Sequence, residues 1–209
     1  LDSPLSRRFV RASLRLADYV SVRDAGSLRL LREIGVPRDI RIFPDLAHGL
    51  EHEAAPPGRA EGDARRTVGI NPMPMYDGRY WPEWAPDKYA RFVSELAAFA
   101  TALQREGYHP FFFGTHPRDE RVAAEALAVM EKEHGIARAA LPPVKSSATI
   151  ERLLAVMESA DVIVPTRFHG TLLALLVERP TLAICYYRKT RELMVEFGQG
   201  EELTVTLED

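Results

Sequence analysis

The sequence predicts an α/β fold built on parallel sheets, and three observations support this prediction. Short β-branched or aromatic runs alternate with longer segments of helical periodicity, the alternation that a parallel sheet with right-handed crossovers requires. The run at 161–164 contains three successive β-branched apolar residues after Asp161, which is typical of a strand buried on both faces. With 46% hydrophobic residues, the 209-residue chain can also bury a substantial core.

The turn between this strand and the next helix is the first candidate site. Pro165 has no N–H group for the sheet, so it marks the end of the strand, and residues 166–170 are expected to form a loop. An almost wholly apolar helix is predicted over about 171–178. Arg167 and His169 would then stand at the amino end of that helix, where unpaired N–H groups and the helix dipole attract anions.

The other elements alternate in the same way and are predicted from periodicity and capping residues. Asp24 can cap the helix that follows it, Pro117 suits the first position of a helix, and Gly35 and Gly107 each end one. Further helices are expected over 3–17, 25–34, 87–106, 117–135, around 150–157 and after Tyr186, and further strands over 19–22, 40–43, 67–70, 111–113 and, at an edge, 141–145.

Composition and missing motifs exclude several classes of function. Lys and Arg (27) nearly balance Asp and Glu (30), which gives no global field for nucleic acid. No GxGxxG, Walker loop, nucleophile elbow or metal-spaced His and Cys cluster is present, so we expect no cofactor and no metal. His48 and His52 have helical spacing but lack a third ligand.

The sequence also indicates where the protein acts. Cys185 is the only cysteine, so no internal disulfide can form, and we interpret it as a small buried hydrophobic residue in a reducing compartment. No apolar run approaches the roughly 20 residues that a membrane helix needs, and no signal-peptide pattern follows Leu1. A cytoplasmic location without an integral membrane segment is therefore expected.

Other candidate residues follow strands in the same manner. Arg23 comes directly after the predicted strand at 19–22, which repeats the layout around Arg167. His116 lies on the ligand-facing edge, although a capping role is the simpler interpretation. A long loop begins at Asn71, and its aromatic residues could stack on a sugar ring or pack the loop onto its own domain: Tyr76, Tyr80, Trp81 and Trp84.

Two segments carry a family resemblance. The R-F-H-G at 167–170, followed by R-P-T-L-A-I-C-Y-Y-R-K-T-R-E-L-M, resembles the carboxyl-terminal signature of the polysaccharide pyruvyl transferases. In that family an Arg-Leu-His or Arg-Phe-His triplet precedes a helix, and a strand ending in Tyr with a nearby Lys follows. The segment A-D-Y-V-S-V-R-D-A-G-S-L-R-L-L-R-E-I-G-V, with F-P-D after it, resembles an earlier part of the same family. The similarity is weakest between about 51 and 145.

The resemblance implies a fold and a division into domains. The family's fold is similar to the glycosyltransferase-B type, which has two Rossmann-like domains. Residues 1–50 would be the remainder of a truncated amino-terminal Rossmann-like domain, and 67–209 the carboxyl-terminal one. Residues 51–66 are polar, rich in Ala, Pro and Gly and without periodicity, which independently predicts an interdomain linker.

The resemblance also implies a reaction, in which a pyruvyl group passes from phosphoenolpyruvate to two hydroxyls of a sugar as a cyclic ketal, in cell-surface polysaccharide biosynthesis. The partners would be phosphoenolpyruvate and a sugar or polysaccharide precursor, with peripheral contact to a lipid-linked acceptor allowed. His169 would be the acid/base, and Arg167 and Arg23 the clamp for the donor's anionic groups. Asn71 and Lys189 would help to bind substrate.

A geometric expectation follows, and two alternatives stay open. Because phosphoenolpyruvate is small, Arg23, Arg167 and His169 should converge within roughly 10 Å of one another. One alternative is a glycosyltransferase or nucleotide-sugar epimerase of the two-Rossmann type, whose Arg and His would bind a diphosphate. The other is a non-catalytic sugar-binding domain.

Overall fold

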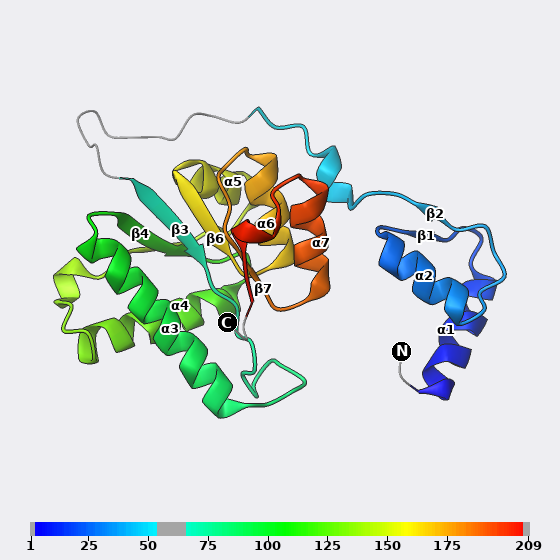
Figure 1. Ribbon diagram of the computed structural model, residues 1–209, viewed down its shortest axis with the longest axis horizontal. Coiled ribbons are helices and arrows are strands. Elements are labelled where there is room, and N and C mark those ends of the chain that lie inside the picture. The colour runs from blue at the N-terminus through cyan, green and yellow to red at the C-terminus, as the bar shows by residue number, and fades with distance from the viewer. Residues whose placement is uncertain (1–2, 54–65, 207–209) are drawn as a thin grey trace. The chain divides into compact units, whose positions relative to one another are not determined.

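The computed structural model describes residues 3–53 and 66–206 (Figure 1). The chain divides into two compact units, Leu1–Glu51 and His52–Asp209. Most of the predicted linker, residues 54–65, lies outside the described residues. Near its start, His52 Nε2 is 2.8 Å from Glu158 Oε1, a contact within the second unit.

The first unit is small and is held by one pair of parallel strands. Three residues form its buried core, Ile34, Val36 and Ile40. Asp24 caps the second helix by accepting a hydrogen bond from the N–H of Ser27 at 2.6 Å, as the sequence predicts. The elements are α1 (Pro4–Leu16), β1 (Ser21–Val22), α2 (Ala25–Glu33), β2 (Arg41–Ile42) and the 3-10 helix η1 (Leu46–Gly49), and β1 pairs with β2.

Helix α1 uses only part of the apolar stripe that its sequence predicts. Val10 and Leu14 pack against the small core. Leu5 and Phe9, on the same predicted stripe, remain 77% and 72% exposed. A core of this size covers one side of the helix, because few apolar side chains are available to pack against it.

The second unit contains the larger sheet. Four strands pair in parallel in the order β5-β4-β3-β6, and β7 pairs in parallel with β8. A bridge between Ile163 and Thr181 connects the start of the β7 segment to β6. The elements are β3 (Thr67–Asn71), α3 (Pro86–Arg105), β4 (His109–Phe113), α4 (Pro117–Lys132), η2 (Arg138–Ala140), β5 (Val144–Lys145), α5 (Ile150–Glu158), β6 (Val162–Pro165), α6 (Phe168–Leu176), β7 (Ala183–Cys185), α7 (Arg188–Glu196), η3 (Glu201–Leu203) and β8 (Thr204–Thr206).

Helices cover both sides of this sheet. In Figure 1, α3 and α4 lie together on one side, and α6 and α7 lie together on the other. The central strands contribute fully buried side chains, among them Ile70, Phe112 and Phe113. The predicted α/β class with parallel strands is therefore confirmed, and the segment predicted to be an edge strand forms β5 at the end of the order.

The start of α6 corrects one prediction. The helix expected from about 171 begins at Phe168, so residues 168–170 form its first turn instead of a loop. Arg167 takes the N-cap position and makes no side-chain capping bond. Because the N-cap residue is not Ser, Thr, Asp or Asn, the sequence carries no capping signal for this helix start. Gly170 suggested a loop, but it is buried inside the helix, where an added Cβ would lie 2.7 Å from Asn71 Oδ1 and force a shift.

Candidate functional site

The carboxyl ends of three neighbouring strands bring the candidate residues together. Strand β3 has β4 on one side and β6 on the other. The chain runs from β3 through β4 to β5 in one direction across the sheet, and from β6 to the β7 segment in the opposite direction. Ligands of open α/β sheets bind outside such a switch point. Asn71 ends β3, the turn at 114–116 follows β4, and Arg167 follows β6.

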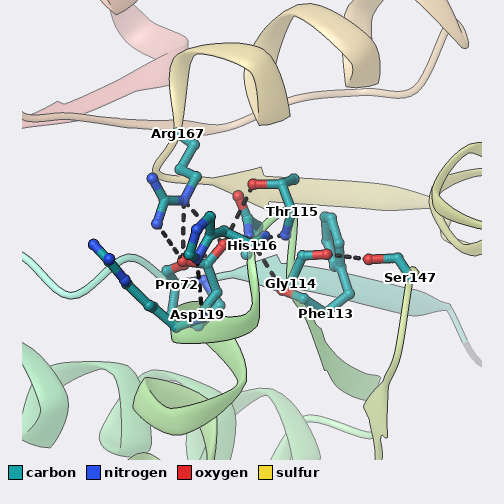
Figure 2. Close-up of polar contacts among 10 residues, drawn as sticks. Pro72, Phe113, Gly114, Thr115, His116, Asp119, Ser147 and Arg167 are labelled. Atoms are coloured by element: carbon teal, nitrogen blue, oxygen red, sulfur yellow. Dashed lines mark hydrogen bonds and ion pairs between the residues drawn. The ribbon is translucent and has the colours of Figure 1, made fainter. Parts of the chain in front are cut away.

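A buried carboxylate organises this edge. Asp119 is fully buried and accepts hydrogen bonds from the backbone N–H groups of Thr115 and His116, both at 3.1 Å (Figure 2). The Thr115 hydroxyl is a third donor, at 3.3 Å. His116 caps α4 in turn, because its Nδ1 accepts from the N–H of Arg118 at 3.1 Å. The capping role for His116 is therefore confirmed, and the turn after β4 is held rigidly.

Arg167 is fixed by the same carboxylate. Its Nε donates to Asp119 Oδ1 at 3.0 Å and Oδ2 at 2.9 Å, and its Nη2 donates to Oδ1 at 2.6 Å (Figure 2). A forked, charge-assisted contact of this kind is strong and directional. The Arg167 side chain is 26% exposed, so the guanidinium is held in one orientation at the amino end of α6 while part of it stays accessible.

Asn71 has a different environment from the one expected of a substrate-binding residue. Its side chain is fully buried, and its Nδ2 donates to the Phe113 carbonyl at 3.1 Å and to Asp119 Oδ2 at 3.4 Å. Its Oδ1 has no hydrogen-bond partner among the described residues. A Cβ at position 170 would lie 2.7 Å from Oδ1, so only glycine lets α6 approach β3 this closely. Asn71 therefore connects the end of β3 to Phe113 and Asp119 by hydrogen bonds, and it packs closely against α6 at Gly170. Its predicted role in substrate binding stays a prediction.

His169 and Lys189 are both exposed side chains in first helical turns. His169 lies in α6, with its ring edge-on to that of Phe168 at a centroid distance of 5.4 Å. Lys189 lies in the first turn of α7, which follows β7. Since parallel strands feed both helices, the two side chains stand at the same edge of the sheet as Arg167.

Aromatic side chains pack together just after the end of β7. Trp81 stacks on Tyr187 with centroids 6.3 Å apart and meets Tyr186 edge-on at 5.5 Å. Burial raises the pKa of the Tyr186 phenol, while the positive charge of Arg167 acts to lower it, which puts the phenol within the electrostatic reach of Arg167. Trp81 thus packs the loop onto its own domain, one of the two fates that the sequence allowed.

Arg23 makes a simpler contact in the first unit. Its Nη1 donates to Asp45 Oδ2 at 2.7 Å, at the turn between β1 and α2. The two side chains are 38% and 15% exposed. Arg23 belongs to a different unit from Arg167 and His169, and its predicted convergence with them stays a prediction.

Asp119 is the residue that sequence reasoning missed. A signal for it exists in H-P-R-D, where an acidic residue three positions after the N-cap predicts a capping box. Its contacts with Asn71 and Arg167, each 48 positions away, leave no local signal.

Two further features concern what the site could hold. Cys185 is buried, and burial raises the pKa of its thiol, which suits the predicted small hydrophobic residue better than a nucleophile. In residues 3–53 and 66–206, no group of three or more His, Cys, Asp or Glu side chains is placed to hold a metal ion. The same part of the chain has no helix of the length and hydropathy that crossing a bilayer requires.

Comparison with known proteins gives the chain a family. The crystal structure of TarM is similar to it with a TM-score of 0.51 and 13% identity, over 93% of this chain and 39% of TarM, and at that identity the similarity shows the fold alone. No curated protein sequence matches the chain at a significant level. The family model for polysaccharide pyruvyl transferase matches residues 1–187, a range that includes the early segment and the carboxyl-terminal segment as far as Tyr187, but not Lys189. That resemblance is confirmed, and the chain belongs to the polysaccharide pyruvyl transferase family.

Proposed function

We propose that this chain carries the donor site of an enzyme that transfers a pyruvyl group from phosphoenolpyruvate to a sugar during polysaccharide biosynthesis. Family membership supports a transferase acting on polysaccharides. One observation carries the donor assignment: the Arg167 guanidinium, fixed by the buried Asp119, stands beside the exposed His169 in the first turn of α6. A fixed guanidinium at a helix amino end suits a carboxylate or a phosphate.

The chemistry needs few groups. A proton is added to the terminal enol carbon, and positive charge develops on the neighbouring carbon. The first sugar hydroxyl forms a C–O bond to that carbon and gives up its proton. The second hydroxyl then replaces the phosphate at the same carbon, which closes the cyclic ketal and releases phosphate. Imidazole side chains titrate near neutral pH and suit these proton transfers, so His169 is assigned as the acid/base.

The remaining candidates have supporting roles in this proposal. Arg167 binds one anionic group of the donor, and Arg23 is assigned to the other. Lys189, at the same sheet edge as His169, contributes to substrate binding. Asn71 acts as a positioning residue, because its buried amide joins the strand end to the Asp119 turn. A cytoplasmic site of action fits phosphoenolpyruvate as the donor.

The finer fold assignment belongs to the same proposal. We infer that residues 67–209 form a Rossmann-like domain of the glycosyltransferase-B type, that residues 1–50 belong to the partner domain, and that 51–66 link them. The order β5-β4-β3-β6, with the β7 segment bridged to the far side of β6, supports this inference, since doubly wound sheets grow outward in both directions from a central first strand.

Donor binding tests the proposal. In isothermal titration calorimetry, phosphoenolpyruvate should bind the chain more tightly than UDP. Arg167→Lys should weaken phosphoenolpyruvate binding, because a point charge cannot replace a fork. The matched control is Arg91→Lys, on an exposed face of α3, which should bind like the parent chain. UDP binding without phosphoenolpyruvate binding would reject the proposal and favour a glycosyltransferase or epimerase.

A further inference from the structure

A pocket separate from the donor site lies beside the loop that follows β3. It has a volume of about 420 Å³ and lies where this loop meets the amino end of α3. That volume falls within the range of ligand-binding pockets. None of the donor-site residues lines it, so the pocket is a separate feature of the same unit. Its lining residues are Tyr76, Asp77, Gly78, Arg79, Trp84, Pro86 and Tyr89.

Trp84 forms an open aromatic wall of this pocket. The indole lies against Gly78 so closely that a Cβ there would be 2.6 Å from Trp84 Cδ1. It is nevertheless 71% exposed. The ring of Trp81, the other tryptophan of the sequence, packs against Tyr186 and Tyr187 instead. A large apolar ring held on a glycine and left open to solvent is suited to stacking against a ligand.

The polar lining residues Asp77, Arg79 and Tyr89 are held in place by one another and by Glu125, which lies outside the lining. Arg79 Nε donates to both oxygens of Asp77, at 2.8 and 2.9 Å, and Arg79 Nη2 donates to Glu125 Oε1 at 3.0 Å. The Tyr89 hydroxyl donates to Glu125 Oε2 at 2.5 Å. Arg79 holds the pKa of Asp77 below its ordinary value, and burial with the Glu125 contact raises the pKa of Tyr89. The ionised Asp77 carboxylate and the neutral Tyr89 phenol therefore keep fixed acceptor and donor positions near neutral pH.

The backbone beneath the pocket is strained and held in place. Tyr76 has a φ of 60°, a left-handed conformation that is uncommon for an aromatic residue. Its carbonyl accepts from the N–H of Ala85 at 3.2 Å, and the Lys88 ammonium lies 4.9 Å from its ring centroid. Strain of this kind persists where surrounding contacts enforce it, and such places are often ligand sites.

We propose that this pocket binds one hexopyranose ring of the acceptor saccharide, with the ring's C–H face on Trp84 and its hydroxyls at Asp77 and Arg79. The inference rests on the proposed function for the existence of a sugar acceptor. The polar lining residues pair their charges internally, so they offer directional hydrogen bonds to a neutral polyol more readily than a site for a free anion. An apolar ligand would remove water from these polar groups without replacing the hydrogen bonds that water makes to them.

Saturation-transfer difference NMR tests the pocket directly, with methyl β-D-glucopyranoside, methyl β-D-galactopyranoside and methyl α-D-mannopyranoside as probes. At least one glycoside should receive saturation on its ring C–H protons. Trp84→Ala should weaken that binding at least 10-fold, a loss of about 1.4 kcal/mol, which is within the range of one aromatic contact. Trp84→Tyr should restore part of it, because the aromatic platform returns. Unchanged saturation in Trp84→Ala would overturn the proposal.

Controls separate this inference from the proposed donor site. Tyr108→Ala removes an exposed aromatic side chain beyond the carboxyl end of α3 and should leave glycoside binding intact. Phosphoenolpyruvate calorimetry on Trp84→Ala should match that of the parent chain. Phosphoenolpyruvate binding with no glycoside binding would overturn the pocket alone. Glycoside binding lost in Trp84→Ala, in a chain that binds no phosphoenolpyruvate, would support the pocket and reject the donor site.

Discussion

Two arginines occupy the same local position and have different surroundings. Arg23 follows β1 and precedes α2, and Arg167 follows β6 and precedes α6. Each donates to a carboxylate from elsewhere in its own unit. Arg23 donates from Nη1 to Asp45 Oδ2 at 2.7 Å, in a pair whose side chains are 38% and 15% exposed. Arg167 makes a forked contact to Asp119, which is completely buried.

The two arginines share a strand-to-helix turn, so the turn alone does not determine how firmly each one is held. The burial of the carboxylate that accepts from it makes the difference. An ion pair open to water contributes little, since solvent screens it and both side chains lose freedom. A buried carboxylate cannot be left without its partner, because no water replaces the lost contact. Arg167 is therefore tied more firmly to the architecture of its unit than Arg23 is.

The largest expected effect concerns the residue two positions after each arginine, which is His169 in one turn and Ala25 in the other. If proton transfer depends on His169, His169→Gln should lower turnover by about 10²- to 10⁴-fold and leave phosphoenolpyruvate affinity nearly unchanged. Phosphate release, assayed with the acceptor found by the glycoside screen, measures turnover, and calorimetry measures affinity. His134→Gln, beyond the far end of α4, is the control. Normal turnover in His169→Gln would remove the catalytic role.

The next effect is on stability and compares the two carboxylates. Asp119→Ala should lower the free energy of unfolding by about 3–5 kcal/mol, because it leaves the Arg167 fork and two backbone N–H groups without their acceptor. Asp45→Ala should cost less, about 1–2 kcal/mol, because it removes a partly exposed ion pair and the cap of η1 at the Ala47 N–H. Urea denaturation followed by far-UV circular dichroism measures both. Equal losses would mean that burial does not distinguish the two pairs.

A smaller effect is expected where α6 meets β3. Gly170→Ala would bring a Cβ within 2.7 Å of Asn71 Oδ1, and the resulting shift should cost about 1–3 kcal/mol of stability. Gly49→Ala is the matched control in the first unit, because nothing lies within 4 Å of the added Cβ, and it should change stability by about 0.5 kcal/mol or less. Thermal denaturation of both variants checks this, and a neutral Gly170→Ala would contradict the close approach.

The smallest effect involves a third cation, whose described partners carry no charge. Lys145 Nζ donates to the Ser159 hydroxyl at 2.8 Å and lies 3.7 Å from the centroid of the Phe111 ring. Burial lowers its pKa below the ordinary value of 10.5. Between the lowered value and 10.5 the unfolded chain binds more protons, so this lysine makes stability rise with pH in that window.

Removing the lysine should flatten that rise. Lys145→Met should reduce the increase in unfolding free energy between neutral and alkaline pH, as measured by urea denaturation at a series of pH values. Lys88→Met, at an exposed position on α3, should keep the slope of the parent chain. Identical slopes in the parent and Lys145→Met would show that the ammonium is not desolvated.

Much of the fold was predictable from the sequence because the signals were local. The apolar runs gave β3, β4 and β6, and Pro117 marked the start of α4. The start of α6 was misplaced, because Arg167 caps it without the side-chain bond that a capping residue normally supplies. Asp119 was missed because its acceptor role depends on Asn71 and Arg167, which only the folded sheet brings near it. The sequence does not reveal which polar groups will be buried together when their partners lie far away along the chain.

The central place of β3 has a consequence for how the protein folds as it is made. Strand β3 can pair with β4 once the ribosome has released residue 113, but its other neighbour, β6, ends only at Pro165. The contact from Thr67 N–H to Asp161 Oδ2 spans 94 positions, which gives this unit a high contact order and slow closure. Until Arg167 has been synthesised, the Asp119 carboxylate lacks the guanidinium that pairs with it in the folded interior. The nascent chain therefore keeps a hydrated, open sheet edge, a species that chaperones typically protect from aggregation.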